Sequence, residues 1–359
     1  MVLPRPELAA LQPATHGGVV PHDWKSEGPG RWSDFSVNTN PLGAPPGLTR
    51  LLTRSLLERY PEPDGWFARE ALAAHLGILP QQIVLGNGAV ELIRLAAQAF
   101  LAPGDAAVIP VPAFGEYVPA CQIAGARVVP VTLEEQEGFR IEPDRLVSAA
   151  RRSDARVLFL CNPNNPTGQL LPRATVASLL SSLPETVIVV DEAYMRFAPG
   201  GWRSEDLLAA GNVVILRSLT KDWGLPGLRL GYALAPAPLA DVLNRIRPPW
   251  NVNSLAQAAV PYLLRQQGHV DRGVELALAA REYLMTGFSA LGYGVLPTDA
   301  HFFLMNVGSA AEFTRRLWRK GFLVRDCTSF GLPHYVRIAP QRFSACRALL
   351  RAAKEVDLP

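Results

Sequence analysis

The sequence has few cysteines, and none of them is spaced as a metal-binding pair. Only Cys121, Cys161, Cys327 and Cys346 occur among 359 residues, without a CxxC motif or a histidine at ligand spacing. This pattern argues against a zinc site and against a disulfide framework. We therefore expect no metal, and reduced thiols in a cytoplasmic protein.

Strong net charge and long apolar runs are also missing. The 35 lysines and arginines nearly balance 32 acidic residues, so the net charge of +3 gives no indication of a nucleic-acid partner. No apolar stretch approaches the length of a membrane span, and prolines interrupt the N-terminal residues where a signal peptide would need an apolar core. The sequence thus predicts a soluble protein without a membrane partner, and any positive potential must be local.

Short apolar runs alternate with segments of helical periodicity through the middle of the chain. Nearly continuous apolar strands alternating with helices predict an α/β fold with a mostly parallel central sheet covered on both faces. The expected strands lie at 83–85, 107–109, 127–129, 157–160, 187–190 and 213–216, and two of the expected helices at 90–101 and 173–183.

The ends of the chain differ from this middle part. The first fifty residues are rich in proline and glycine, whereas a long helical stretch at 254–291 and short strands at 301–307 and 335–338 follow residue 240. We predict an N-terminal segment (1–50) that contributes to a small domain and to the active site. A large domain (51–240) and a small α+β C-terminal domain (241–359) complete the predicted organisation.

Three polar motifs follow predicted strands, where ligands of open α/β sheets bind. Small residues at Gly88 and Ala89 begin a helix whose N–H groups favour an anion, although a plain tight turn is the simpler interpretation. Asn165, in the rigid segment 162–168, either presents its amide to the strand ends or serves as a turn residue. Asp191, in Asp-Glu-Ala-Tyr194, either needs a cationic partner or caps the next helix.

A fourth motif, at 217–231, decides among these alternatives. It places Ser218 three residues before Lys221 and Arg229 eight residues after it, in a loop punctuated by glycine. Such a loop can hold a hydroxyl and a guanidinium around a phosphate while the amine of the lysine forms a Schiff base with a carbonyl. A carboxylate is expected to support the ring nitrogen of a pyridine cofactor used in this way.

The motif SxxKxxGxxGxRxG, together with NNPTG and DEAY upstream, resembles the class I/II aminotransferases that depend on pyridoxal 5′-phosphate (PLP). The resemblance covers nearly the whole chain and implies the type I aminotransferase fold. By this resemblance Lys221 carries PLP, Asp191 supports the ring nitrogen, and Tyr194 and Asn165 bind the 3′-oxygen. Ser218, Arg229 and the backbone of Gly88 and Ala89 would bind the phosphate, Phe114 would stack on the ring, and Tyr60 would reach the partner's phosphate in a homodimer.

The outer motifs resemble one branch of this family, the L-threonine-O-3-phosphate decarboxylases. These motifs are THGG at 15–18, PPWNVN at 248–253, RDC at 325–327 and YVRI at 335–338. The resemblance implies decarboxylation of O-phospho-L-threonine to (R)-1-amino-2-propanol O-2-phosphate in cobalamin biosynthesis. The alternative is a histidinol-phosphate aminotransferase or a related 2-oxoglutarate-dependent aminotransferase. The implied substrate-binding residues are His16, Gly17, Asn38, Asn165, Arg325 and Arg337, with the two arginines matching the two anionic groups of the substrate.

Overall fold

A computed structural model describes residues 5–9, 11–51 and 55–356. Its central feature is a seven-stranded sheet in the order β2-β8-β7-β6-β5-β3-β4. Only β8 runs antiparallel to its neighbours in this sheet. The strands are β2 (Ile83–Gly86), β3 (Ala106–Val111), β4 (Arg127–Thr132), β5 (Ala155–Cys161), β6 (Val187–Asp191), β7 (Val213–Ser218) and β8 (Gly231–Leu234).

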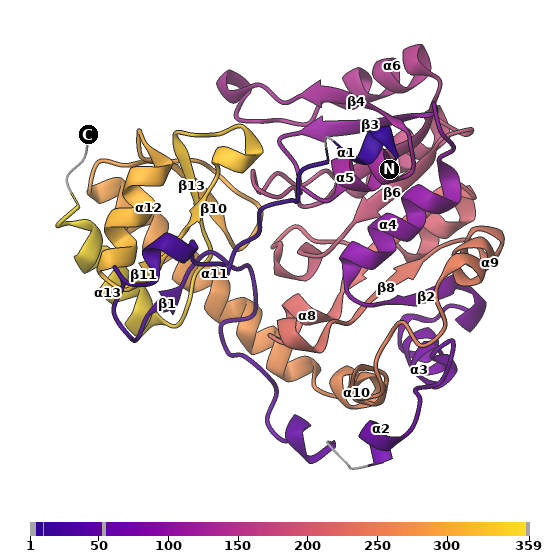
Figure 1. The fold of residues 1–359 in the computed structure, drawn as a ribbon, viewed down its shortest axis with the longest axis horizontal. Helices are drawn as coiled ribbons and strands as arrows, with labels where there is room; N and C mark the ends of the chain where they lie inside the picture. The colour runs from indigo at the N-terminus through magenta and orange to yellow at the C-terminus, as the bar shows by residue number, and fades with distance from the viewer. Residues whose placement is uncertain (1–4, 10, 52–54, 357–359) are drawn as a thin grey trace, which may run out of the picture.

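Helices pack on both faces of this sheet, as the nearly continuous apolar strands predict (Figure 1). Alternate residues of one strand enter different cores: Val157 and Phe159 face one helical layer, whereas Leu158 and Leu160 face the other. One layer contains α4 (Ala89–Phe100), α5 (Tyr117–Ile123) and α9 (Ala237–Ile246). The other contains α3 (Trp66–Leu76), α6 (Pro143–Ser153), α7 (Arg173–Ser182) and α10 (Ser254–Leu264).

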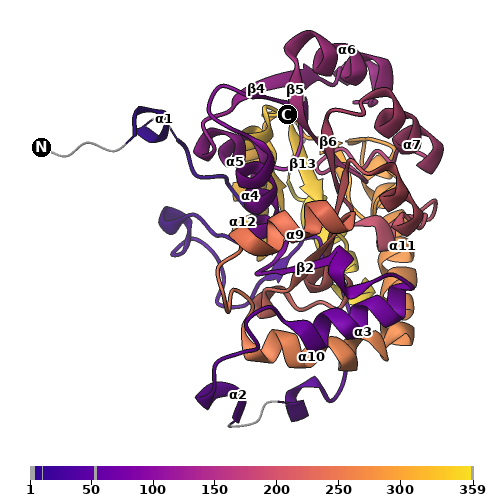
Figure 2. The ribbon, with the colours of Figure 1, turned by 90° about the vertical axis from the view of Figure 1, so that its right-hand side faces the viewer.

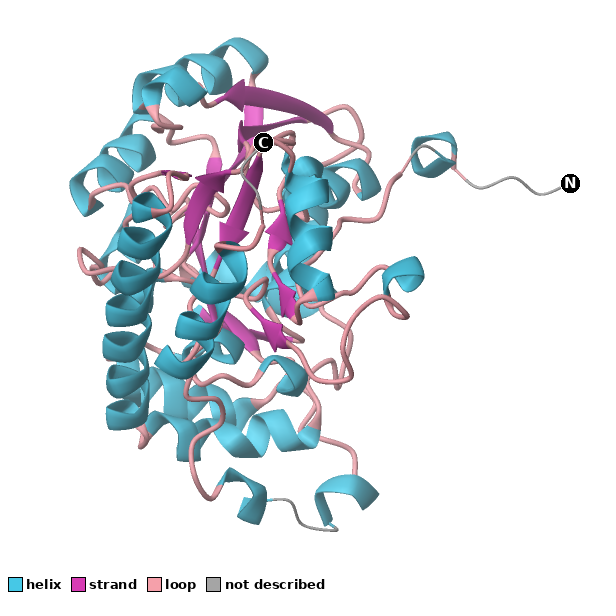
Figure 3. Ribbon diagram, turned by 90° about the vertical axis from the view of Figure 1, so that its left-hand side faces the viewer, coloured by secondary structure: helices cyan, strands magenta, loops and turns pink. Residues whose placement is uncertain are grey.

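The C-terminal part forms a second sheet with the antiparallel order β12-β13-β10-β9. It packs with α11, the long helix that stands out in Figure 3, and with α12 and α13 around a separate apolar core. The elements are β9 (Gly294–Val295), β10 (Phe303–Asn306), β12 (Arg325–Asp326), β13 (Tyr335–Ile338), α11 (Gln267–Ala290), α12 (Ala310–Arg319) and α13 (Phe343–Ala353).

The N-terminal residues extend along both parts of the molecule. α1 (Pro6–Ala9) contacts α5 and stands out from the body of the molecule (Figure 2). β1 (Ser33–Asp34) pairs in parallel with β11 (Phe322–Leu323) (Figure 1). Short elements complete the fold: α2 (Ser55–Glu58), α8 (Leu219–Asp222), and the 3-10 helices His22–Trp24, Leu48–Leu51, Pro80–Gln82, Glu135–Glu137, Met195–Phe197, Glu205–Ala210, Pro226–Leu228 and Thr328–Phe330. None of the helices in the described part has both the length and the apolar character needed to cross a bilayer.

Candidate active site

A cavity of about 840 Å³ opens where the central strands end. Cys161, Asp191 and Ser218, the last residues of β5, β6 and β7, all line it. Parallel neighbouring strands bring their carboxyl ends to one edge of the sheet, so motifs far apart in sequence meet there. The cavity is lined from the C-terminal part as well, by Arg325 and Arg337.

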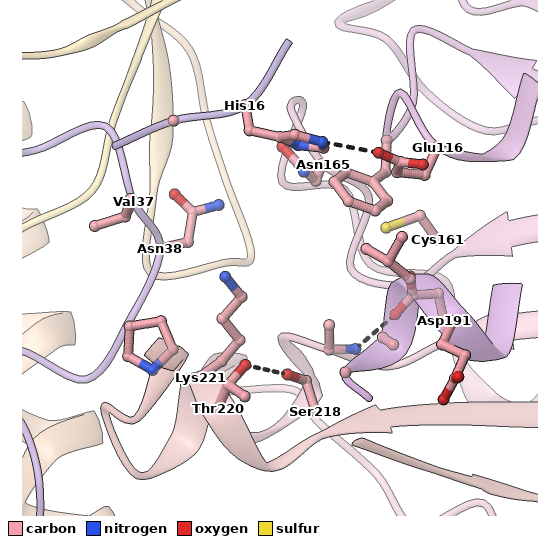
Figure 4. Close-up of a pocket in the computed structure, with 18 of the residues that line it drawn as sticks. His16, Val37, Asn38, Glu116, Cys161, Asn165, Asp191, Ser218, Thr220 and Lys221 are labelled. Atoms are coloured by element: carbon pink, nitrogen blue, oxygen red, sulfur yellow. Dashed lines mark hydrogen bonds and ion pairs between the residues drawn. The ribbon is translucent and has the colours of Figure 1, made fainter. Parts of the chain in front are cut away.

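Lys221 extends from α8 into this cavity (Figure 4). Although the residue has intermediate exposure, removal of water from around its amine lowers the pKa of Lys221 to about 8. The positive charges of Arg337 and Arg229 contribute to this lowering of the pKa, and the carboxylate of Asp191 opposes it. Roughly one fifth of the amine is therefore neutral near pH 7.4, far more than in an ordinary lysine, and the neutral form is the one that attacks a carbonyl.

Asp191 is buried at the end of β6, and two donors fix its carboxylate. The hydroxyl of Tyr117 donates to Oδ2 at 2.9 Å, and the backbone N–H of Ala193 donates to Oδ1 at 3.0 Å. Burial raises the pKa of Asp191, and the hydrogen bond from Tyr117 partly offsets this rise. A buried carboxylate with this geometry needs a cation or an N⁺–H donor in the cavity, as a protonated pyridine ring nitrogen would provide.

The start of α4 and the loop after α8 together form a cradle for an anion. Gly88, the residue before α4, has a φ of 78°, and a Cβ built on it would lie 2.4 Å from Nη2 of Arg229. Ser218 and Thr220 add hydroxyl groups that lie 2.8 Å apart. A helix N-terminus, a guanidinium and two hydroxyls are the donors that a phosphate group requires, so this end of the cavity fits the phosphate of PLP.

Arg325 and Arg337 are buried, with relative exposures of 6% and 4%. Arg337 donates to the side-chain oxygen of Asn165 and, at 2.6 Å, to the carbonyl of Ser36, while its Nε has no partner. Arg325 donates to Thr15 O at 2.8 Å and, through the same Nη2 atom, to a serine hydroxyl. Among the described residues neither guanidinium forms an ion pair with a carboxylate. The interpretation of these arginines as solvated surface charges is therefore excluded.

Three polar side chains lie near these arginines. Tyr194 is buried, which raises the pKa of its hydroxyl to about 12. The amide of Asn38 is buried too, and the Tyr194 hydroxyl lies near it but outside hydrogen-bonding geometry, so both amide atoms lack a partner. His16 lines the same cavity beside Thr15, the residue whose carbonyl accepts from Arg325, and its ring lies 5.9 Å from that of Phe114. Each of these groups can still contact a ligand.

The structure brings together every predicted site residue except Tyr60. The residues that line the same cavity are His16, Gly17, Asn38, Gly88, Ala89, Phe114, Asn165, Asp191, Tyr194, Ser218, Lys221, Arg229, Arg325 and Arg337. Tyr60 is 81% exposed, and its ring packs on Trp250 at 4.8 Å. Within one chain it does not reach the cavity.

Sequence reasoning missed Tyr117, Thr220 and Glu116. Thr220 lies beside two predicted residues and could have been added from the chemistry of a hydroxyl-rich phosphate loop. Tyr117 follows Phe114 by three residues, but only the packing of α5 shows that its hydroxyl meets Asp191. Glu116 gave no signal, because its partner is 100 residues away in the sequence.

Known proteins of the same fold and family match this chain. The family described as aminotransferase class I and II matches residues 32–346. "Histidinol-phosphate aminotransferase 2" of Ralstonia nicotianae is 38% identical over 89% of this chain and 88% of its own. "Histidinol-phosphate aminotransferase" of Moorella thermoacetica is 33% identical over 98% of this chain and 92% of its own.

Solved structures agree on the fold. A histidinol-phosphate aminotransferase from Sinorhizobium meliloti in complex with PLP superposes with a TM-score of 0.88 at 23% identity, covering 98% of this chain and 96% of the other. L-threonine-O-3-phosphate decarboxylase from Porphyromonas gingivalis has a TM-score of 0.80 at 29% identity, covering 90% and 98%.

These comparisons correct the predicted reaction. Curated relatives at 33–38% identity carry the name histidinol-phosphate aminotransferase, whereas the decarboxylase occurs as a structural neighbour. The prediction of O-phospho-L-threonine decarboxylation, and with it a lyase of cobalamin biosynthesis, is therefore wrong. The physical reason is that both reactions use PLP and both candidate substrates carry a phosphate, so the motifs that identify the cofactor do not identify the bond that breaks.

Proposed function

The chain belongs to the class I and II aminotransferases and depends on PLP, and from this premise we propose that it transfers an amino group between histidinol phosphate and 2-oxoglutarate. The observation that carries the proposal is the pair of buried guanidiniums, Arg325 and Arg337, which lack a carboxylate partner and line the same cavity as Lys221. Buried charges of this kind need a counter-ion, and the substrate supplies it.

The two arginines suit both substrates of such a transfer. Histidinol phosphate has one phosphate and no carboxylate, whereas 2-oxoglutarate has two carboxylates, and both must occupy the same site in turn. A planar guanidinium binds either anion through two N–H groups. We assign Arg337 to the anionic group next to the reacting carbon, because it holds Asn165 beside the end of β5 and its free Nε lies buried there.

Bound PLP supplies an electron-withdrawing ring that stabilises charge left on the substrate Cα when a bond to it breaks. In our proposal Asp191 holds a proton on the ring nitrogen, and Tyr117 orients Asp191 through its hydrogen bond. Nζ of Lys221 would take the proton from the substrate Cα and later give it back, acting first as a base and then as an acid. A pKa of about 8 suits this exchange, because the amine accepts and releases a proton near neutral pH.

The remaining site residues bind and orient. We propose that Gly88, Ala89, Ser218 and Arg229 hold the cofactor phosphate, and that Phe114 stacks on the ring. Tyr194 keeps its proton, since its pKa is about 12, and can donate to the 3′-oxygen together with the amide of Asn165. His16, Gly17 and Asn38 line the substrate side of the same cavity.

We also propose a homodimer in which Tyr60 completes the partner's site. Tyr60 and Trp250 form a surface pair with exposures of 81% and 45%, and Phe67 nearby in the sequence is 72% exposed. Large aromatic side chains left in water favour a protein contact over solvent. A hydroxyl at this position could reach a phosphate across a two-fold axis.

The test is a coupled assay of the purified protein with histidinol phosphate and 2-oxoglutarate. Formation of glutamate, with loss of activity in Arg337→Leu and retained bound cofactor, supports the proposal. Carbon dioxide release from O-phospho-L-threonine without glutamate formation in the first assay would overturn it. The matched variant Arg342→Leu changes an exposed arginine outside the cavity and is expected to keep full activity.

A further inference from the structure

A second buried carboxylate, that of Glu116, lines the cavity together with Asp191. The side chain of Glu116 is 8% exposed, and no role in cofactor or substrate binding has been assigned to it above. Its oxygen Oε1 lies 2.8 Å from Nε2 of His16, and its oxygen Oε2 lies 3.4 Å from Nη2 of Arg94. The shorter of the two contacts makes His16 the main partner of this carboxylate.

The partner His16 belongs to a segment that bridges the cavity. At one end of this segment the carbonyl of Thr15 accepts a hydrogen bond from Arg325, and at the other end the N–H of Gly18 donates to the hydroxyl of Ser36 at 2.7 Å. Glycine at position 17 allows close approach, because a Cβ there would lie 2.3 Å from the carbonyl oxygen of Ser36. His16 thus connects the C-terminal part to the start of α5 (Figure 4).

We propose that Glu116 is a positioning residue that holds His16, and with it residues 15–18, over the substrate side of the cavity. The carboxylate of Glu116 is hydrogen-bonded to Nε2 of the imidazole. Nδ1 is therefore the ring nitrogen that can face a ligand. Phe114, two residues before Glu116, lies against the same ring, so the turn that shapes the cofactor site also sets the His16 ring. The pair of His16 and Glu116 contributes to substrate selection, because it orients Nδ1 of His16 toward the end of the substrate that lies farthest from the cofactor.

This inference rests on the proposed function for its kinetic test. Glu116→Leu removes the acceptor of the His16 hydrogen bond at similar side-chain volume. KM for histidinol phosphate should rise about tenfold and kcat should stay within about twofold, because the lost charge-assisted hydrogen bond positions a side chain that only binds substrate. His16→Ala should do the same. The double variant should be no worse than either single variant, since both changes break one interaction.

Two further variants separate positioning from a general effect on folding. Glu116→Gln keeps an acceptor and should raise KM by only about threefold. Arg94→Leu removes the longer contact to Glu116 and leaves the His16 contact in place, so KM should stay within about twofold. Unchanged KM in Glu116→Leu, or additive effects in the double variant, would overturn the proposal.

A second readout does not depend on the substrate. Amide hydrogen exchange at residues 15–18 of the PLP-loaded protein should be faster in Glu116→Leu than in the wild type and unchanged in Arg94→Leu. If the wild type does not act on histidinol phosphate, the proposed function fails, but faster exchange still supports the positioning role. Equal exchange in Glu116→Leu and wild type would refute it.

Discussion

At the scale of single residues, the site depends on charges that are held out of water. Lys221 is the clearest case, because desolvation lowers the pKa of its amine from 10.5 to about 8, with Arg337 and Arg229 acting in the same direction. The same protein environment buries Arg337 and Asp191 and leaves them to be neutralised by what binds. The catalytic and binding groups are therefore prepared before any ligand arrives.

The first prediction concerns the pH dependence of cofactor attachment. Only the neutral amine of Lys221 attacks the aldehyde of PLP, so the attachment rate in cofactor-free protein should rise with pH and level off above about 8. Stopped-flow absorbance across pH 6–11 measures this. The Lys221→Ala protein should show no product that borohydride fixes at this position. A midpoint near the ordinary lysine pKa would contradict the burial that we describe.

The second prediction concerns Tyr117. Tyr117→Phe removes the hydroxyl that donates to Asp191 at 2.9 Å and leaves the ring in place. Loss of a hydrogen bond to a charged group costs about 1.5–3 kcal/mol, so the Kd for PLP should rise at least about tenfold. Equilibrium dialysis measures this Kd. The matched variant Tyr293→Phe removes another buried hydroxyl, whose partner is Val356 O, and should keep the wild-type Kd.

At the scale of elements, an ion-pair cluster fixes the ends of β6 and β7 from behind the cavity. Arg217, in β7, donates to Glu192 and to Glu205, each at 2.9 Å, and to the hydroxyl of Ser204. Glu192 directly follows Asp191, and Arg217 directly precedes Ser218, so this cluster sets the positions of two site residues. Glu192 is fully buried, which makes its charge dependent on Arg217.

The third prediction follows from this cluster. Arg217→Met leaves the buried carboxylate of Glu192 without its cation and should lower the free energy of unfolding by about 3–5 kcal/mol. Urea denaturation followed by circular dichroism measures the loss. Arg173→Met breaks a surface pair with Asp206 and should cost less than about 1 kcal/mol. Equal losses in the two variants would show that the cluster contributes no more than a surface pair.

At the scale of the whole molecule, the cavity lies between the central sheet and the C-terminal part. Arg325 and Arg337 come from β12 and β13 of the second sheet, whereas Asp191 ends β6 of the first sheet and Lys221 lies in α8, directly after β7. The predicted boundaries at residues 50 and 240 stay a prediction. In the function that we propose, substrate and cofactor would therefore be held by different parts of the chain.

The fourth prediction tests the role of Tyr60 across a dimer. Tyr60→Ala and Lys221→Ala should each lose most activity as separate proteins. After mixing and random reassociation, half of the dimers are hybrids with one intact site of two, so about one quarter of wild-type activity should return. Recovery is measured by the histidinol phosphate assay. No recovery, with hybrids confirmed by mass spectrometry, would place Tyr60 in the site of its own chain or outside it.

The sequence by itself determined the fold family and the cofactor. Lys221, Asp191 and Ser218 each follow an apolar run, and parallel strands must bring their carboxyl ends to one edge, so local sequence was sufficient to group them. The resemblance to the family, and not this reasoning, grouped Gly88 with Arg229 as phosphate-binding residues, because the motif at Gly88 alone favoured a plain tight turn. Glycine at position 88 is itself a local signal, because its positive φ is a conformation that other residues rarely adopt.

Only the tertiary structure decided the features that depend on distant contacts. Burial of Arg325 and Arg337 without an ion pair, the hydrogen bond from Tyr117 to Asp191, and the contact between His16 and Glu116 join residues separated by tens to hundreds of positions. No local pattern encodes such packing. The sequence motifs do not predict which reaction is catalysed. The reaction depends on which bond to Cα the site holds perpendicular to the cofactor ring, and that orientation is a property of the assembled cavity.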